Sequence, residues 1–356
     1  MTVAVTRTWD TLTPGREIDL SPYGTFRVAE QNLGEFLDGQ GELPFTLRPG
    51  AIRRFVDLSG AEGRWASIDF TDDTEAPTVY AGMVITREAL HLKKRVVEPD
   101  AAPVPLARLK CPNCGGDLPA RAGKQAQRVA CPYCKTLSDL ETHKVIARQQ
   151  DLREKLAIPL GKQGRIHKTP WTVVGFMRRS TVVEGERFVW SEYLLYNVDK
   201  GFTWLIEDEG VWLIGTALQS GDVDTSGYPR RVQYKNNPFK ARNAGEARVE
   251  YVLGEFYWKV EVGETVDTRD FERFRNVVSR EESAGEVQWT YSTVIPTEQL
   301  FGAFELPVPA PPPPPPSQYA SYNADDENEG AKSDDELRSN RIMFAVMAFF
   351  LLVMLS

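Results

Sequence analysis

Three runs of sequence carry the clearest signal of the fold: Phe188-Val-Trp-Ser-Glu-Tyr-Leu-Leu-Tyr196, Phe202-Thr-Trp-Leu-Ile206 and Val211-Trp-Leu-Ile214. Each run is short and dense in aromatic and β-branched residues, the types that favour strands. Turns that contain glycine end the runs, at Asp199-Lys-Gly201 and at Glu209-Gly210. Short runs at intervals of about 8 to 12 residues predict antiparallel hairpins that close into a sandwich or a small barrel.

The same pattern continues on both sides of this stretch. Five of the eight tryptophans fall between Trp171 and Trp258. In the run over residues 248–260, large apolar side chains recur at every second position, Val249, Tyr251 and Leu253, until Gly254, which predicts a bulge or a sharp bend there. We therefore predict a β-rich domain over residues 158–306.

A second β-rich domain is predicted over residues 1–98. Trp65-Ala-Ser-Ile-Asp-Phe70 and Thr78-Val-Tyr-Ala-Gly-Met-Val-Ile85 are typical of strands, and the acidic segment 71–75 joins them. Prolines at positions 99, 103 and 105 then interrupt any regular element and mark a boundary.

Length and composition limit the class of protein. The chain has 356 residues, enough for two or three domains of about 150 residues each. Charged residues make up 26% and hydrophobic residues 42%, which excludes a polytopic membrane protein and a wholly disordered chain. The net charge of -8 argues against a surface built throughout for nucleic acid.

Four cysteines form the strongest motif in the chain. Cys111-Pro-Asn-Cys114 and Cys131-Pro-Tyr-Cys134 are separated by the segment 115–130, giving the pattern C-x2-C-x16-C-x2-C. Two tight turns of this kind supply the four sulfur ligands that zinc prefers. The pattern predicts a zinc ribbon over residues 106–138. Because four cysteines leave no position for an activated water, we expect the Zn2+ to be structural.

Other interpretations of the cysteines are weaker. Two disulfide bonds need an oxidising compartment, and the segment from Met1 to Leu20 contains no apolar run of the kind found in a secretory signal. A redox dithiol usually occurs once, in a βαβ context, and an iron–sulfur cluster stays a minor alternative. A catalytic zinc deaminase is disfavoured because none of the histidines stands in an H-x-E sequence: His91, His143 and His167.

Basic residues around the cysteine pairs raise the alternative of nucleic-acid binding. They are Arg108, Lys110, Arg121, Lys124, Arg128 and Lys135, against one acid, Asp117. The segment 115–130 between the pairs includes no aromatic side chain on which a base could stack. We therefore interpret these residues as surface charge and do not expect nucleic acid as the partner.

A short linker helix is predicted over residues 139–157, after the ribbon. Val145, Leu152 and Leu156 recur on one helical face, with basic side chains elsewhere. The predicted helix ends before Pro159.

A Pro-rich, acidic tether is predicted over residues 307–340. Six consecutive prolines, Pro311 to Pro316, favour an extended polyproline conformation. The acidic segment that follows cannot bury enough apolar surface to offset the cost of ordering the chain. The alternative is that the prolines bind a partner domain that recognises proline.

The C-terminal segment, residues 341–356, is predicted to be a membrane anchor. Ile342 to Leu355 is an unbroken apolar run. As a helix, the segment from Ser339 to Ser356 would span about 27 Å, close to the hydrocarbon thickness of a slightly thinned bilayer. The side chains expected in lipid include Ile342, Phe344, Phe349, Phe350 and Leu352.

The anchor sets the expected topology. Without a secretory signal at the N-terminus, a C-terminal anchor predicts a single-pass tail-anchored protein whose folded domains lie in the cytoplasm. Arg338 and Arg341 precede the apolar run, as the positive-inside rule expects. The alternative is a buried C-terminal helix, but a helix that is apolar on all sides needs a core to enter.

Motifs of catalysis are missing from the sequence. It has no phosphate loop, dinucleotide glycine pattern, H-E-x-x-H or nucleophile elbow. Glu192 and Glu255 do lie within aromatic runs, beside Trp190 and Trp258. If they converged, they could form an acid pair or bind a cationic, polyamine-like ligand. The simpler interpretation, which we favour, is that each glutamate faces solvent or pairs with a surface lysine or arginine, while the aromatic residues build the core.

Five short motifs in the second β region carry a resemblance to a known family. They are Trp171-Thr-Val-Val-Gly175, Trp190-Ser-Glu-Tyr-Leu194, Trp204-Leu205, Gly254-Glu-Phe-Tyr-Trp258 and Gly263-Glu264. In this order they resemble the bacterial domain-of-unknown-function family numbered 4178, over roughly residues 158–304. The resemblance implies a β-rich module, often preceded by a zinc ribbon and followed by a hydrophobic segment. It implies no activity; such proteins are often encoded near envelope-stress and polyamine-related genes.

The sequence as a whole predicts a mainly β protein with two small antiparallel β domains, barrel- or sandwich-like. A zinc ribbon and a short helix separate the domains, and a transmembrane helix ends the chain. The leading functional hypothesis is a non-enzymatic, tail-anchored adaptor or scaffold that binds an unidentified protein, in an envelope-stress system or another membrane-associated complex. The alternatives are a module or unrecognised enzyme that takes a small cationic molecule, and nucleic-acid binding by the ribbon.

Overall fold

The structure is a computed structural model that describes residues 8–36, 50–70, 77–85, 89, 109–119, 121–150, 155–183, 185–283 and 285–309. Of these described residues, 58% are in strands and 7% in helices, which confirms the predicted mainly β class. Within these residues no helix is long and apolar enough to cross a membrane. The predicted anchor, and the tether beyond residue 309, lie outside the described residues.

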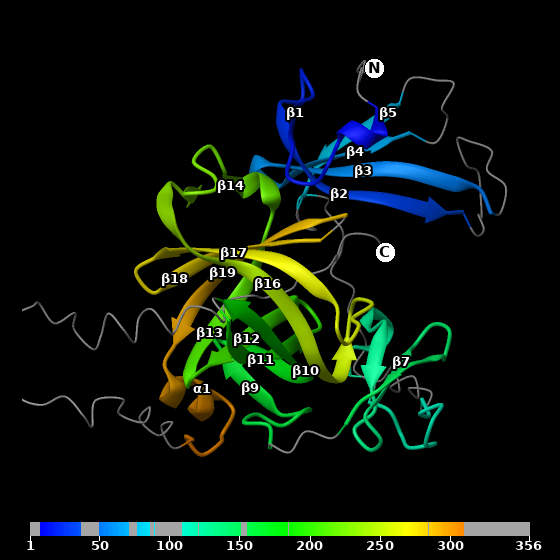
Figure 1. The fold of residues 1–356 in the computed structure, drawn as a ribbon, viewed down its shortest axis with the longest axis vertical. Helices are drawn as coiled ribbons and strands as arrows, with labels where there is room; N and C mark the ends of the chain where they lie inside the picture. Colours follow the sequence, from blue (N-terminus) through cyan, green and yellow to red (C-terminus); the bar gives the residue numbers. More distant parts are fainter. Residues whose placement is uncertain are drawn as a thin grey trace, which may run out of the picture. The chain divides into compact units, whose positions relative to one another are not determined.

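An antiparallel sheet of five strands forms the N-terminal part (Figure 1). Its strands follow one another in the sheet as they do in the chain: β1 (Glu17–Asp19), β2 (Thr25–Glu35), β3 (Ile52–Gly60), β4 (Arg64–Asp69) and β5 (Thr78–Met83). Two 3-10 turns accompany them, η1 (Trp9–Thr11) and η2 (Ala61–Gly63). β4 and β5 are the two strands that the sequence predicts in this region.

One face of this sheet carries an apolar core, because inward side chains on neighbouring strands are in register. Val28 pairs with Leu58, and Leu58 with Ala66. The buried members of this core are Leu12, Ile18, Leu20, Phe26, Val28, Val56, Leu58, Ala66 and Ile68. A bulge in β2 after Val28 shifts the alternation by one residue, so that Glu30 pairs with Asp57 on the opposite face.

Eight strands form a barrel, one of the two architectures predicted. They are β10 (Thr169–Val183), β11 (Glu186–Asn197), β12 (Gly201–Asp208), β13 (Val211–Leu218), β16 (Asn237–Phe256), β17 (Thr265–Arg273), β18 (Asn276–Glu282) and β19 (Val287–Ile295). The strand order is β16-β17-β18-β19-β13-β12-β11-β10, and β10 pairs again with β16.

Shorter elements complete this part of the chain. They are β9 (Gln163–Ile166), η4 (Ser220–Asp222), β14 (Val223–Asp224), β15 (Arg231–Tyr234) and the helix α1 (Thr297–Ala303). β9 pairs with β10, and β15 pairs with both β14 and β16.

The aromatic runs over residues 188–196, 202–206 and 211–214 lie in β11, β12 and β13. Tyr193 of β11 pairs with Phe176 on one side and with Leu205 on the other. Leu205 in turn pairs with Ile214, so that a row of apolar side chains crosses four strands. Phe301 of α1 packs on the same core, its ring 5.5 Å from that of Trp212.

Gly254 lies where two of the sequence motifs meet. It pairs with Gly175 of β10 on one side and with Ala130 on the other. Its φ is +84°, and a Cβ built on it would lie 2.2 Å from the carbonyl oxygen of Val174. The break predicted at Gly254 is therefore a close approach of two backbones, which only glycine permits.

Three short strands belong to the cysteine region: β6 (Arg128–Ala130), β7 (Thr136–Asp139) and β8 (Val145–Arg148). β6 pairs with β16 of the barrel and with β7, and β7 pairs with β8. The predicted helix over residues 139–157 is wrong, because the described residues of that range contain a turn and β8. His143 has a φ of +55°, which breaks a helix and reverses the chain into the hairpin.

The described chain divides into two compact units that are not consecutive in sequence. The first comprises the described residues before 104 together with 217–241 and 266–291, and the second comprises the described residues of 105–216, 242–265 and 292–309. Two segments from inside the predicted domain 158–306 therefore belong with the N-terminal sheet.

Within the first unit, Arg27 of β2 joins the N-terminal sheet to η4 and β14. Arg27 is 9% exposed, and its guanidinium donates to the carbonyl oxygens of Ser220 at 3.1 Å and Val223 at 2.6 Å. Gly221 lies against Gly60 so closely that a Cβ on it would be 2.2 Å from the carbonyl carbon of Gly60.

A second contact within the same unit joins β2 to the segment before β19, and it includes two glutamates. Glu30 forms an isolated antiparallel bridge with Glu286, and the amide of Gln31 donates to the carbonyl oxygen of Gly285 at 2.9 Å. Burial raises the pKa of Glu286 to about 8, a hydrogen bond from Gln288 opposes this, and the charge of Glu30 adds to it. Burial also raises the pKa of Glu30.

The raised pKa of Glu286 predicts that the protein loses stability as pH rises. The folded state holds a proton that the unfolded state releases near pH 4.5, so the stabilisation is complete below that pH and is lost as pH rises through about 8. Glu286→Gln should remove on the order of 3 kcal/mol of this pH dependence. Urea unfolding between pH 5 and pH 9 measures the slope. The exposed Glu186→Gln is the control, and an equal slope in wild type and Glu286→Gln would contradict the prediction.

Gly254→Ala should destabilise the protein by about 3 kcal/mol or more, because the methyl group meets the Val174 carbonyl as well as an unfavourable φ. Gly201→Ala is the matched control: its φ is +72°, but a Cβ there has no atom within 4 Å. The control should lose only about 1 kcal/mol. Chemical denaturation measures both, and similar losses would show that the close approach is not the cause.

Candidate metal centre

Two tight turns place the four cysteines. In the first, the amide of Gly115 donates to the carbonyl oxygen of Cys111 at 2.9 Å, and in the second the amide of Lys135 donates to that of Cys131 at 3.0 Å. The two turns are alike because the residue after the second cysteine has a positive φ in both, +71° at Gly115 and +58° at Lys135. The predicted C-x2-C turns are therefore present, and each turns both of its sulfurs to one side.

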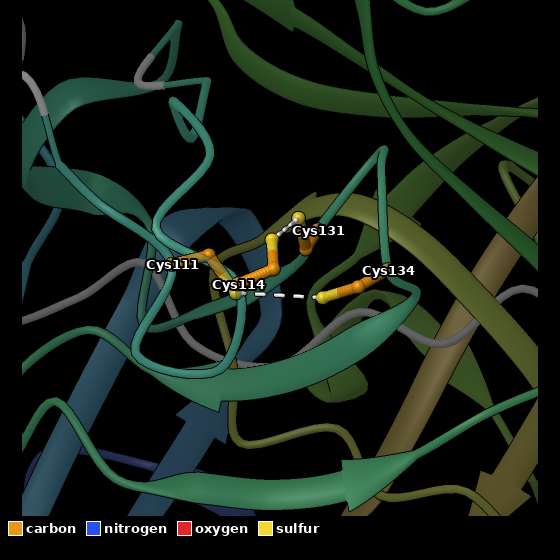
Figure 2. A group of neighbouring side chains, drawn as sticks. All are labelled: Cys111, Cys114, Cys131 and Cys134. Atoms are coloured by element: carbon orange, nitrogen blue, oxygen red, sulfur yellow. Dashed lines mark hydrogen bonds between the residues drawn. The ribbon is translucent and has the colours of Figure 1, made fainter.

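The four sulfur atoms converge on one point (Figure 2). All lie within 4.8 Å of one another; the sulfurs of Cys111 and Cys134 are 3.6 Å apart, and those of Cys114 and Cys131 are 3.8 Å apart. Sulfurs bound to zinc at about 2.3 Å in a tetrahedron are about 3.8 Å apart. The donor set and its spacing therefore fit a tetrahedral metal ion.

The surroundings of the sulfurs differ from one cysteine to the next. Cys111 and Cys131 are buried, against Leu118 and Val129, whereas Cys114 is exposed. Burial raises the pKa of the Cys131 thiol to about 12. Burial also acts to raise the pKa of Cys134, but hydrogen bonds with Thr136 and Asn113 outweigh it and lower that pKa to about 5.

Glu255 ties the cysteine region to the barrel. Its carboxylate is fully buried and accepts hydrogen bonds from the backbone amides of Arg121 at 2.9 Å and Ala122 at 2.7 Å. The guanidinium of Arg121 lies 3.7 Å from the same carboxylate. Burial raises the pKa of Glu255, while the two amides and Arg121 oppose the shift.

Gln149 makes a second connection between the cysteine region and the barrel, and no sequence motif predicts it. Its side-chain amide donates to the carbonyl oxygens of Lys135 and Val252, both at 3.0 Å, and its oxygen accepts from the amide of Val252 at 2.9 Å. One side chain thus joins the second cysteine turn to β16. No sequence pattern marks it, because one of its partners, Val252 of β16, lies 103 residues away in the chain.

Glu192 lies in a different group from Glu255. It is fully buried, and its Oε1 accepts from the indole nitrogen of Trp190 at 2.7 Å and from the guanidinium of Arg179 at 3.4 Å. Arg179 is 1% exposed, and its guanidinium carbon is 5.7 Å from the centre of the Trp190 ring. The structure therefore gives Glu192 a buried ion pair with a protein cation.

The tryptophans proposed as ligand contacts are core residues. Trp190 and Trp258 are each 2% exposed. The Trp258 ring packs edge-to-face against Trp204, at 5.5 Å, and against Phe256, at 5.0 Å. This placement agrees with the simpler interpretation for the aromatic residues. For the glutamates that interpretation is wrong, because neither Glu192 nor Glu255 faces solvent: both are fully buried, and each accepts hydrogen bonds from protein groups.

Several basic residues of the cysteine region have acidic partners. Arg128 is 5% exposed and lies 3.5 Å from Asp139, and Lys110 pairs with Asp117 at 2.7 Å. Arg121 is beside Glu255. Arg108 lies outside the described residues. The positive charge counted in the sequence is therefore neutralised in part by contacts within the protein.

In comparisons with known proteins, one region of the chain matches a protein family. A family model described as a domain of unknown function (DUF4178) matches residues 159–297, less than half of the chain, and supports the resemblance seen in the sequence. The match does not extend to the cysteine region or to the C-terminal segment. Neither a curated protein nor a solved structure matches the chain.

Glu255→Gln should weaken the attachment of the cysteine region to the barrel. The amide keeps one acceptor but turns an NH2 group toward a backbone N–H, which leaves a buried donor unpaired and costs about 2 kcal/mol. Urea unfolding measures the loss, and hydrogen exchange at the Ala122 amide should become faster.

Glu250→Gln is the matched control on the same strand. Glu250 accepts from Ser180 at 2.6 Å and from Arg187 at 2.9 Å, in a partly exposed position. Its loss should cost less than about 1 kcal/mol. Unchanged exchange at Ala122 in Glu255→Gln would show that the carboxylate does not hold the loop.

Proposed function

We propose that this protein is a non-enzymatic scaffold whose four cysteines hold a structural Zn2+, and that its C-terminal segment attaches it to a membrane. The observation that carries the first part is the convergence of four thiols at the spacing of a tetrahedral site. A bound Zn2+ would cross-link the two cysteine turns through four thiolates and leave no open ligand position.

The contacts around the cysteines support a structural role. The cysteine region shares hydrogen bonds with β16 through β6, through Glu255 and through Gln149. A cross-link of the two turns would therefore also hold β6, the strand between β16 and β7, in place. The two glutamates considered as a ligand site already accept hydrogen bonds from protein groups, which supports a scaffold over a receptor for a cationic ligand.

The membrane part of the proposal rests on sequence. The apolar run 342–355 follows an acidic, Pro-rich segment, and two arginines precede it. A single-pass anchor of this kind would keep the folded part in the cytoplasm, near the bilayer. There it would bind a protein partner, in an envelope-stress system or another membrane-associated complex.

Metal analysis tests the zinc site. The purified protein should contain one zinc per chain, and Cys131→Ser should lose it because Cys131 is a buried ligand. Cobalt bound in place of zinc should show the absorption of a tetrahedral thiolate site. Tyr133→Ala is the control, since Tyr133 lies between two ligands but is 67% exposed and supplies no sulfur. Equal metal content in wild type and Cys131→Ser would exclude the site.

Fractionation tests the anchor. Full-length protein should sediment with membranes and resist extraction by carbonate, whereas a chain truncated after Arg341 should be released. A variant with Glu192→Gln in the barrel should behave like the full-length protein. If the truncated chain and the full-length chain distribute identically, the anchor is refuted, and the zinc result is unaffected.

A further inference from the structure

β5 is the last strand of the N-terminal sheet, and one of its sides is open among the described residues. The amide of Val84 donates to the carbonyl oxygen of Gly63 at 2.8 Å. In an antiparallel pair the direction of the backbone groups alternates along the strand. The N–H and C=O groups of Val79, Ala81 and Met83 therefore point away from β4, toward the open side.

This edge lacks the features that keep edge strands apart. The run Thr78-Val-Tyr-Ala-Gly-Met-Val-Ile85 includes neither a charged residue nor a proline. The strand at the opposite edge, β1, carries Glu17 and Asp19. Natural edges are usually protected by charge, proline or a bulge, because unpaired backbone groups bind other strands.

Apolar side chains are exposed around the same edge. The exposed fraction is 39% for Trp65, 47% for Tyr80, 60% for Met83, 51% for Val84 and 48% for Ile85. By the register, Trp65, Tyr80 and Val84 share one face of the sheet, and exposed apolar residues that lie together usually mark a surface that another protein covers.

The register within the sheet shows which strand would fit. Gly82 pairs with Trp65 of β4, and the Trp65 ring covers it so closely that a Cβ on Gly82 would lie 3.0 Å from the indole nitrogen. A second β5 that is antiparallel and centred on Ala81 places its Ala81 opposite Ala81, and its Tyr80 opposite Gly82. The large Tyr80 ring then lies opposite a residue without a side chain, next to Trp65, on the same face of the sheet.

We propose that β5 pairs with β5 of a second copy of this chain, so that two five-stranded sheets join into one. Three features favour a second copy. The pairing is symmetric about Ala81, it matches Tyr80 with Gly82 twice, and an uncharged strand brings no like charges together. The backbone groups of Val79, Ala81 and Met83 supply the hydrogen bonds across the axis.

Light scattering or sedimentation of the full-length protein in detergent tests the pairing. Wild type should be a dimer. Ala81→Pro removes a backbone N–H that points away from β4, so the hydrogen bonds between β4 and β5 are kept. The two hydrogen bonds between the Ala81 residues of the two copies are lost. Self-association should weaken by about tenfold or more. Ala81→Val, which keeps the amide, is the control and should remain a dimer with an unchanged melting temperature.

Opposite charges at the axis test the register. Ala81→Lys and Ala81→Glu should each weaken self-association, because like charges then face each other. An equal mixture of the two should restore dimers, since lysine then faces glutamate. Association that is insensitive to Ala81→Pro would assign the dimer to another surface and overturn the proposal. A monomer whose Ala81 amide resists hydrogen exchange would assign the edge to a segment of the same chain and overturn it also.

Discussion

Two strands pack against Gly254 at once, and the cysteine region is attached next to it. β10 approaches from one side through Gly175, and β6 from the other through Ala130. No side chain fits between these backbones, since even a Cβ on Gly254 would overlap the carbonyl of Val174. Glu255, the next residue, then accepts the two amides of the loop before β6. The dipeptide Gly254-Glu255 therefore positions both β10 of the barrel and the loop that leads to the second cysteine pair.

The buried charges serve this same arrangement. A buried carboxylate is costly unless it is paired or accepts hydrogen bonds. Glu255 meets the requirement with backbone amides, and Glu192 meets it with Arg179 and the Trp190 indole. Both glutamates lie within aromatic runs because their partners are in the core, and this explains a pattern that resembles a ligand site in the sequence. Each carboxylate restricts how its neighbours pack.

The cysteine turns are part of a sheet as well as a candidate metal site. β6 and β7 continue the hydrogen bonding of β16, and Gln149 fastens the second turn to the same strand. A cross-link through the four sulfurs would therefore stabilise strands of this sheet rather than a separate small domain. This continuity is the structural basis for proposing that a metal bound there has a structural role.

Local features of this protein follow from its amino-acid sequence alone. Aromatic and β-branched runs with glycine turns predict the strands, and the spacing of four cysteines predicts that their sulfurs converge, because short-range geometry decides both. Residues 139–157 show where this fails: Val145, Leu152 and Leu156 have a helical period, yet Val145–Arg148 is a strand. Tertiary contacts produce this strand, because Gln149 binds Val252, 103 residues away, and β7 pairs with β8. Barrel closure, the separate partners of Glu192 and Glu255, and the pairing of Gly175 with Gly254 depend likewise on contacts between distant residues, which no local pattern encodes.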